Sequence, residues 1–222
     1  MTTYTATREI SLEETAKKEV SPIVTANLDG LAKFLSFETM LSTLDQIPMK
    51  DVKADDTTSE ADVQCCIAET MAHRMLSKCP DVRFETDLDK RVNGYEIEPH
   101  YFGARVYIMK GDKRVRTKVE YDMLVFYKDM PVVVQVKSMK QWGLYQKIGN
   151  SLKTAQQLYG TKEVGMLAFF PFYTNWQKYP QMVEKNNPEV RCIDLGYNKK
   201  QLQEAMNRFY KARSSRVDIL GC

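Results

Sequence analysis

Two adjacent apolar segments of the chain contain charged residues at positions where β-strands normally carry apolar side chains. The first runs from Glu120 to Phe126 and the second from Val132 to Lys137, with a short polar break between them. Strand interiors usually exclude Asp and Lys, so Asp122 and Lys137 need an explanation. A carboxylate, an amide oxygen and a strand carbonyl are the hard oxygen ligands that Mg²⁺ and Mn²⁺ prefer. A lysine beside such a metal can steer a bound water or stabilise negative charge in a transition state.

The two segments are predicted to form a β-hairpin that brings these side chains together. With Lys128–Pro131 as a symmetric turn, Asp122 lies opposite Lys137, and Leu124 lies opposite Gln135. Opposite residues share a face, with Cβ atoms about 5 Å apart. Gln135 and Lys137 are two residues apart and share that face too. We therefore expect Asp122, Gln135 and Lys137 to form one cluster, which an odd loop or a bulge would disrupt.

A plainer interpretation of the same residues is a buried ion pair between Asp122 and Lys137. Buried charges are usually paired, so the two side chains alone do not decide between an ion pair and a metal site. The order of the elements around the hairpin bears on this choice, because a metal site needs further ligands from neighbouring elements.

The spacing of the hairpin residues resembles the core motif of the PD-(D/E)XK nuclease superfamily. Asp122 is followed thirteen residues later by Gln135 and, after one more residue, by Lys137. The pattern Glu-x-Asp-apolar-apolar, then apolar-apolar-x-x-Lys, is especially similar to the Holliday-junction-resolvase-like branch. The resemblance implies an α/β fold with a restriction-endonuclease-like α-β-β-β-α-β core, in which helices flank a mixed central sheet.

The resemblance also implies an activity, which is the Mg²⁺- or Mn²⁺-dependent hydrolysis of DNA by an endonuclease. In that function Asp122, Gln135 and the Val136 carbonyl would hold the metal. Lys137 would position the attacking water and stabilise the pentavalent phosphate. The similarity of the pattern to the resolvase-like branch suggests branched DNA as one form of substrate.

A helix is predicted upstream of the hairpin, from about Thr57 to Lys78. Thr57 and Glu60 have the spacing of a capping box, and apolar residues follow at helical intervals. Glu69 lies on the apolar stripe of this helix, where a carboxylate needs a partner. In the resembling family a helix before the strands supplies an acidic residue to the metal site, and Glu69 matches that role. The alternatives are that Glu69 reaches solvent or pairs with His73 one turn on.

A second helix is predicted from Lys140 to Tyr159, followed by a buried strand at residues 164–170. In related nucleases this helix often offers a Gln or Lys to the scissile phosphate. Lys153, Gln156 and Gln157 are candidates on its polar side, with solvated helix surface as the alternative for each. The order helix, strands, hairpin, helix, strand is the one that the resemblance requires.

One position departs from the family pattern, because Gln135 replaces the usual acidic residue before x-Lys. Glutamine has an acceptor oxygen but no charge, so it should hold a metal more weakly. Glu120 is two residues from Asp122, on the same face of a strand, and its carboxylate would compensate for the missing charge of Gln135. Two other functions therefore stay open. One is a catalytically inactive DNA-binding protein with the nuclease fold, and the other is a structural or interaction domain with a buried Asp–Lys pair.

A row of basic residues leads towards the proposed site. If the chain from Arg114 to Asp122 is one continuous strand, then Arg114, Arg116, Lys118 and Glu120 share a face with Asp122. Such a row of cations would follow a phosphate backbone. Ordinary charged strand surface, which protects sheet edges, is the alternative.

The global composition describes a globular protein. The 222 residues are 43% hydrophobic and 27% charged, with a net charge of +3, so any basic surface must be local. No apolar run has transmembrane length and the N-terminus lacks a signal-peptide pattern, so we expect a cytoplasmic protein without a membrane partner. The five cysteines form no CxxC pair and there are two histidines, which argues against a zinc site.

The chain is predicted to divide into a helical extension at residues 1–55 and a nuclease-like core at residues 56–222. Within the extension, residues 9–20 and 27–47 have helical periodicity, and the second stretch has a broad apolar face. A helix this apolar cannot remain exposed. It either packs on the core or forms the interface of a homodimer, which is the oligomer that we expect.

Overall fold

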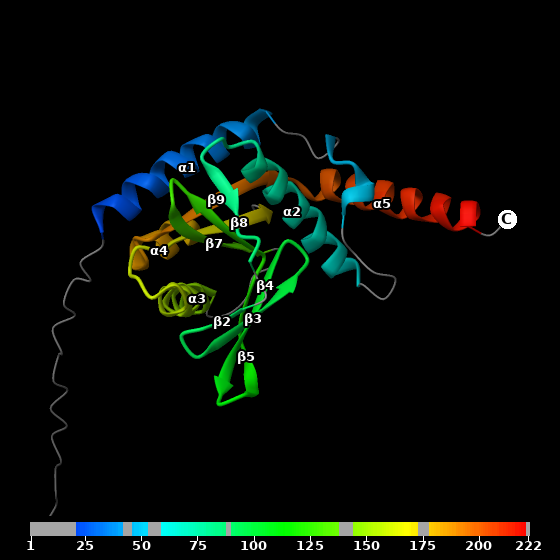
Figure 1. Cartoon of the computed structure of the whole chain (residues 1–222). Coiled ribbons are helices and arrows are strands. Elements are labelled where there is room, and N and C mark those ends of the chain that lie inside the picture. The colour runs from blue at the N-terminus through cyan, green and yellow to red at the C-terminus, as the bar shows by residue number, and fades with distance from the viewer. Residues whose placement is uncertain are drawn as a thin grey trace, which may run out of the picture.

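The computed structural model describes residues 21–41, 46–52, 59–87, 90–137, 144–172 and 178–220, which form a mixed α/β protein (Figure 1). In chain order its elements are α1 (Pro22–Leu41), the 3₁₀ helix η2 (Met49–Asp51), α2 (Glu60–Ser77), β1 (Val82–Phe84), β2 (Lys90–Val92), β3 (Tyr95–His100), β4 (Gly103–Lys110), β5 (Lys113–Tyr121), β6 (Met123–Tyr127), β7 (Met130–Val136), α3 (Leu144–Tyr159), β8 (Gly165–Phe172), α4 (Lys178–Asn186), β9 (Val190–Tyr197) and α5 (Lys199–Leu220). The predicted helix at 9–20 and the cap at Thr57 lie outside the described residues.

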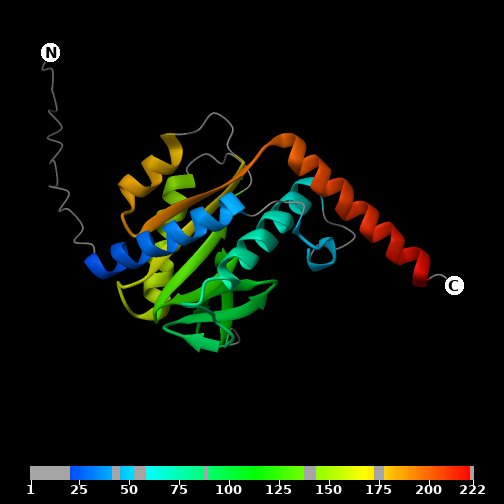
Figure 2. The same cartoon turned by 90° about the horizontal axis from the view of Figure 1, so that it is seen from above.

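A five-stranded mixed sheet forms the centre of the molecule, in the order β1-β6-β7-β8-β9. The β1–β6 and β6–β7 pairs are antiparallel, whereas β7–β8 and β8–β9 are parallel. Helices α1, α2 and α5 cover one face of the sheet, and α3 and α4 cover the other (Figures 1 and 2). Both faces are therefore buried, which explains why β6, β7 and β8 read as nearly continuous apolar runs.

The central hairpin closes with a tighter turn than the sequence predicts. Lys128 and Asp129 form a two-residue turn, both with positive φ (49° and 63°), and Tyr127 pairs with Met130. The predicted four-residue turn is therefore wrong, and the strands are shifted by two residues relative to each other. Two-residue loops with positive φ match the twist of paired strands. Because side chains alternate with a period of two, this shift leaves the faces of the β7 residues as predicted.

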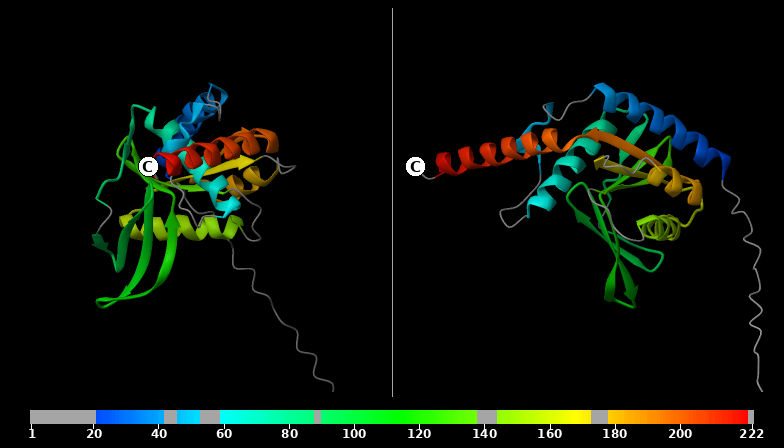
Figure 3. Two further views of the ribbon diagram at one scale, coloured as in Figure 1. Left: turned by 90° about the vertical axis from the view of Figure 1, so that its right-hand side faces the viewer. Right: turned by 180° about the vertical axis from the view of Figure 1, so that it is seen from behind.

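A second, four-stranded antiparallel sheet is inserted between β1 and β6, with the order β2-β3-β4-β5. It projects from the body beside α3 (Figures 1 and 3). Its inner face carries Ile97, Ala104, Val106 and Tyr121, all buried in the same cluster as the apolar residues of α3. The Tyr121 hydroxyl donates a hydrogen bond to the Ser151 carbonyl (2.8 Å), which ties β5 to α3.

Helix α1 packs on the central sheet rather than standing apart from it. Val24, Leu28, Leu31 and Leu35 are fully buried in the cluster that also contains α2 and α5 residues. An ion pair also joins the helix to the sheet, between Asp29 of α1 and Arg191 of β9 (Nε–Oδ1, 2.6 Å). Within the described residues, no helix combines the length and the apolarity needed to cross a lipid bilayer.

Candidate functional site

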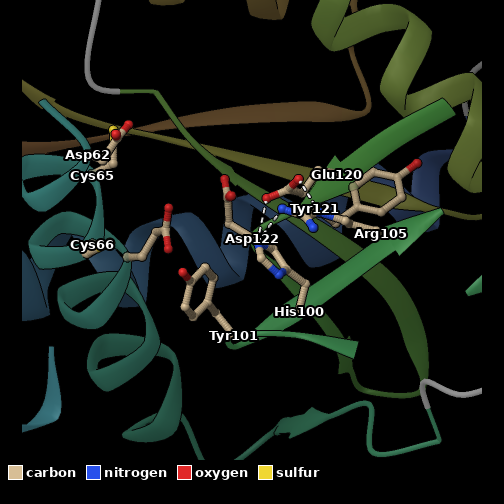
Figure 4. A pocket seen from close by; sticks show the side chains of 10 residues that line it. Asp62, Cys65, Cys66, His100, Tyr101, Arg105, Glu120, Tyr121 and Asp122 are labelled. Carbon is tan, nitrogen blue, oxygen red and sulfur yellow. Dashed lines mark hydrogen bonds and ion pairs between the residues drawn. The ribbon is translucent and has the colours of Figure 1, made fainter. Parts of the chain in front are cut away.

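Two adjacent cavities meet at Glu120, near the junction of the two sheets. The first, of about 350 Å³, lies between α2 and the strand ends and is here called the carboxylate cavity (Figure 4). The second, of about 690 Å³, lies between β5 and α3 and is here called the basic cavity. The carboxylate cavity is lined by Asp62, Cys65, Cys66, Glu69, His100, Tyr101, Arg105, Glu120, Tyr121 and Asp122. The basic cavity is lined by Arg116, Lys118, Val119, Glu120, Gln135, Lys137, Lys147, Asn150, Ser151, Lys153, Thr154 and Gln157.

Asp122 occupies the bend between β5 and β6. Its N–H donates to the Val134 carbonyl (3.0 Å), and its Oδ2 accepts from the Val136 N–H (2.5 Å), so backbone bonds fix the carboxylate against β7. Gly103 of β4 approaches this bend so closely that a Cβ there would lie 2.0 Å from the backbone carbonyl oxygen of Tyr121. The pKa of Asp122 is raised to about 6, chiefly by burial and to a small extent by the charge of Glu120, while Lys137 and the Val136 N–H oppose the rise.

Glu69 of α2 lines the same cavity, where the negative charge of Asp122 acts on its carboxylate. Its pKa is raised to about 8, first by burial and then by the negative charges of Asp122 and Glu120, with Lys137 opposing. Helix α2 begins after Ser59, whose Oγ accepts from the Asp62 N–H (3.3 Å), and it buries its apolar stripe against the sheet. With that packing, Glu69 lines the carboxylate cavity. His73, one turn on, lies against the rings of Phe84 and Phe102 (4.5 and 4.4 Å).

Lys137 follows β7 directly, and its charge lowers the pKa of both Glu69 and Asp122. Its N–H donates to the Phe169 carbonyl (2.9 Å), which fixes its backbone next to β8. Among the described residues, no ion pair within 4.0 Å joins Lys137 to a carboxylate. The direct Asp122–Lys137 ion pair of the plainer interpretation is therefore not formed. Lys137 instead lines the basic cavity, close enough to act on the carboxylates by its charge.

Glu120 is the residue that the two cavities share, and two basic groups hold it. Its Oε2 accepts from Arg105 Nε (2.9 Å), and its Oε1 lies 3.1 Å from His100 Nε2 (Figure 4). Arg105 and Glu120 are cross-strand partners on β4 and β5. His100 and Arg105 could not be predicted as partners of Glu120, because the pairing of β4 with β5 brings Arg105 there and His100 also needs the pairing of β3 with β4.

Gln135 does not line the carboxylate cavity. It is buried, and its Nε2 donates to the Glu120 carbonyl (3.1 Å) and to Ser151 Oγ (3.2 Å). Gln135 therefore links β5 to α3 and lines the basic cavity, whereas Asp122 lines the carboxylate cavity. The single predicted cluster is divided between two cavities because Asp122 sits in a bend, where strand alternation does not apply.

The predicted row of cations on β5 is not formed on one face. The β4–β5 register shifts at two places, so two irregularities interrupt the alternation of β5. Arg114 forms ion pairs with Glu96 and Glu98. Arg116 and Lys118 instead line the basic cavity.

Helix α3 supplies the other wall of the basic cavity. Lys147, Lys153 and Gln157 line it. Gln156 does not, because its Nε2 donates to the Lys162 carbonyl (3.3 Å). For Arg116, Lys118 and Lys153 no ion pair occurs in the described part of the chain, so these cations are available to an anion.

The donor set fits a divalent cation held by two carboxylates. In the ranges that the structure describes, no group of three or more Asp, Glu, His or Cys side chains is arranged as a metal centre. Mg²⁺ does not need one, since it usually keeps several waters and binds one or two carboxylates plus substrate phosphate. Burial raises the pKa values of Glu69 and Asp122, and the charge of Asp122 raises that of Glu69 further, so a cation between the two carboxylates would favour their charged forms.

Comparison with known proteins does not identify a relative. No protein-family model matches the sequence, and no curated protein matches it. Among solved structures, the chain is similar to the protein VC1899 from Vibrio cholerae, with a TM-score of 0.38 and 12% sequence identity over 85% of this chain. The match covers 52% of VC1899, so the chain spans about half the length of that protein. A TM-score this low does not establish a common fold.

Proposed function

We propose that the chain is a metal-dependent nuclease that hydrolyses DNA phosphodiester bonds, as an endonuclease, with Mg²⁺ or Mn²⁺. The observation that carries this proposal is the junction of the two cavities at Glu120. One cavity holds buried carboxylates whose pKa values are raised, and the other is lined by five cationic side chains. Phosphate is the ligand that suits both, because it binds Lys and Arg directly and carboxylates through a metal.

The order of the elements supports the proposal. Helix α2, strands β1, β6 and β7, helix α3 and strand β8 follow the order α-β-β-β-α-β, with the four-stranded sheet inserted after β1. This is the order of a restriction-endonuclease-like core, and β9 extends the sheet by one more parallel strand. The PD-(D/E)XK resemblance implies a site on the central hairpin, and in this chain Asp122 directly precedes β6 and Lys137 directly follows β7.

Each residue has a role that follows from its position. Glu69 and Asp122 would hold the cation, which would neutralise phosphate charge and acidify a bound water. Lys137 lines the basic cavity, its charge acts on Glu69 and Asp122, and it would stabilise the charge that develops on the phosphate. Gln135 would act as a positioning residue rather than a ligand, since it lines the basic cavity and its Nε2 links the Glu120 carbonyl to Ser151 Oγ. Arg116, Lys118 and Lys153 would hold the DNA backbone.

A cleavage assay on labelled DNA tests the function. Single-stranded, duplex, flap and four-way-junction DNA are incubated with Mg²⁺, Mn²⁺ or a chelator. We expect cutting that needs the metal and falls about 10²-fold or more in Lys137→Met, which keeps the aliphatic stem but removes the charge. Lys128→Met is the matched control, because Lys128 lies in the turn of the same hairpin and lines neither cavity. Equal loss in both variants, or cutting in chelator, would refute the assignment.

A second candidate is a DNA-binding protein with the same fold and no catalysis. Two observations favour it, namely the uncharged Gln135 and the ion pair that holds Glu120 to Arg105. It predicts that all four DNA forms are intact after incubation with either metal, while binding still weakens steeply with salt. The cleavage assay therefore separates the two functions.

DNA binding is expected to depend on Arg116 but not on Arg114, although they are two residues apart on β5. Arg116 lines the basic cavity, whereas Arg114 is neutralised by Glu96 and Glu98. Losing one phosphate contact lowers the slope of log K against log salt by about 1. A salt titration of DNA binding should show this change for Arg116→Ala and a parental slope for Arg114→Ala. If the two variants behave alike, the basic cavity is not the DNA path.

A further inference from the structure

We propose that Tyr101 is a stacking platform for an unpaired base next to the scissile phosphate. This inference rests on the proposed nuclease function and names its substrate class, which is DNA with an unstacked nucleotide at the cut. Tyr101 lines the mouth of the carboxylate cavity with 48% of its surface exposed. Figure 4 shows its ring between α2 and the strand that carries His100, on the side of the cavity facing Asp122.

The turn that carries Tyr101 is held in place from both sides. On one side Phe102 stacks on His73 of α2, with ring centroids 4.4 Å apart. On the other side Gly103 packs against the Tyr121–Asp122 backbone, where a Cβ would lie only 2.0 Å from the Tyr121 oxygen. The position of the turn relative to Asp122 is therefore determined by packing rather than by the Tyr101 side chain.

Tyr101 itself adopts a conformation that its residue type disfavours. Its φ is +51°, in the left-handed region where Asn and Gly are preferred over bulky residues. Strained residues of this kind gather at ligand-binding sites, where the surrounding structure holds them. The adjacent His100 ring, 4.3 Å away, supports one side of the Tyr101 ring.

The chemistry of the ligand follows from the neighbours of Tyr101. An exposed aromatic face binds the flat face of a nucleobase, whatever the base, and such stacking requires the base to leave its own stack. Glu69 and Asp122 lie in the same cavity, so a base on Tyr101 belongs to a nucleotide beside the metal-bound phosphate. Single-stranded, flap or junction DNA offers such a base, whereas intact duplex does not.

The test uses the full chain and a DNA strand with 2-aminopurine at each position around the mapped cut. Binding is measured in chelator by the change in 2-aminopurine fluorescence, and cleavage is measured in Mg²⁺. Tyr101→Asn removes the ring but suits the left-handed backbone, so the fold should be retained. We expect a loss of the fluorescence change at one position and a roughly 10-fold weaker Kd. Tyr101→Trp should restore the fluorescence change and the Kd, because tryptophan also offers an aromatic face on which a base can stack.

The control is Tyr210→Asn, which removes another exposed tyrosine, on α5, and should leave both measurements at the parental level. An abasic site at the affected position should weaken parental binding as much as Tyr101→Asn does, and the two changes should not add. If the parent cuts DNA but Tyr101→Asn binds and cuts as well as the parent, the stacking role is wrong and the nuclease function stands. If the parent neither cuts nor binds, the nuclease function itself has failed.

Discussion

Replacing Asp122 with Asn is expected to lower metal-dependent cleavage by about 10²-fold or more and to leave the fold at least as stable as the parent. Asn keeps the shape of the side chain and an oxygen that can accept from the Val136 N–H. It removes a buried negative charge next to Glu69, where burial and Glu120 already raise the pKa of Asp122 to about 6. The charge is unfavourable for folding, so its presence points to a ligand.

The measurement is a comparison of cleavage rate with thermal unfolding for the same variant. Asp194→Asn is the matched control, because Asp194 also has a raised pKa, caused by burial, and also accepts a backbone hydrogen bond, from Gly196. It lies on β9 and lines neither cavity. A purely structural role for the Asp122 charge predicts the reverse for Asp122→Asn, with a clear loss of stability. That outcome, with unchanged cleavage, would reject the metal site.

The metal-free protein is expected to lose stability as the pH rises from about 4.5 to 8. Glu69 has an ordinary pKa of 4.5 and a folded pKa of about 8, raised first by burial. A carboxyl with a raised folded pKa binds its proton more tightly in the folded state. Its contribution to stability is therefore complete below pH 4.5 and is lost as the pH rises through 8. Asp122 adds a smaller effect of the same sign between 3.8 and about 6.

Mg²⁺ is expected to reverse this trend, because it binds the deprotonated carboxylates. Thermal unfolding is followed from pH 5 to pH 8.5 in chelator and in Mg²⁺, and the gap between the two melting temperatures should widen with pH. Glu69→Gln should remove most of the slope in chelator and most of the gap. Glu184→Gln is the control, since Glu184 lies on α4 and accepts the Cys192 N–H. A constant gap across this range would show that the cation does not bind these carboxylates.

The sequence could predict the residues whose positions depend on local periodicity. Glu69 follows from the helical spacing of α2, and the proximity of Asp122 and Lys137 follows from two strands joined by a short turn. The exact register could not be predicted, because the turn residues Lys128 and Asp129 both take positive φ without a glycine. Asn-Gly or Asp-Gly usually marks such a turn. The predicted turn therefore included Met130 and Pro131, although both belong to β7.

Features that depend on the pairing of distant strands could not be predicted from the local pattern of residue types. The irregularities in β5 lie in a stretch where nearly every residue is polar, so the amino-acid types do not show which face each side chain takes. The bonds of Glu120 to His100 and Arg105 require β4 to lie beside β5. The same pairing creates the basic cavity, because it turns Arg116 and Lys118 towards α3.

The inserted sheet gives the molecule a part that can change length independently. Phe84 of β1 pairs with Val125 of β6, so the chain leaves the central sheet and returns to it at neighbouring positions. The turn at Gly111 is an outer tip of the insertion, with positive φ and open space around it, whereas the turn at Gly94 is held to α3 by Asn93, whose Nδ2 donates to the Gln157 and Leu158 carbonyls. Residues added or removed at the Gly111 turn would lengthen or shorten β4 and β5. They would leave the register of the five-stranded sheet unchanged, so this part of the insertion can change in length while the central hairpin beside Asp122 and Lys137 stays as it is.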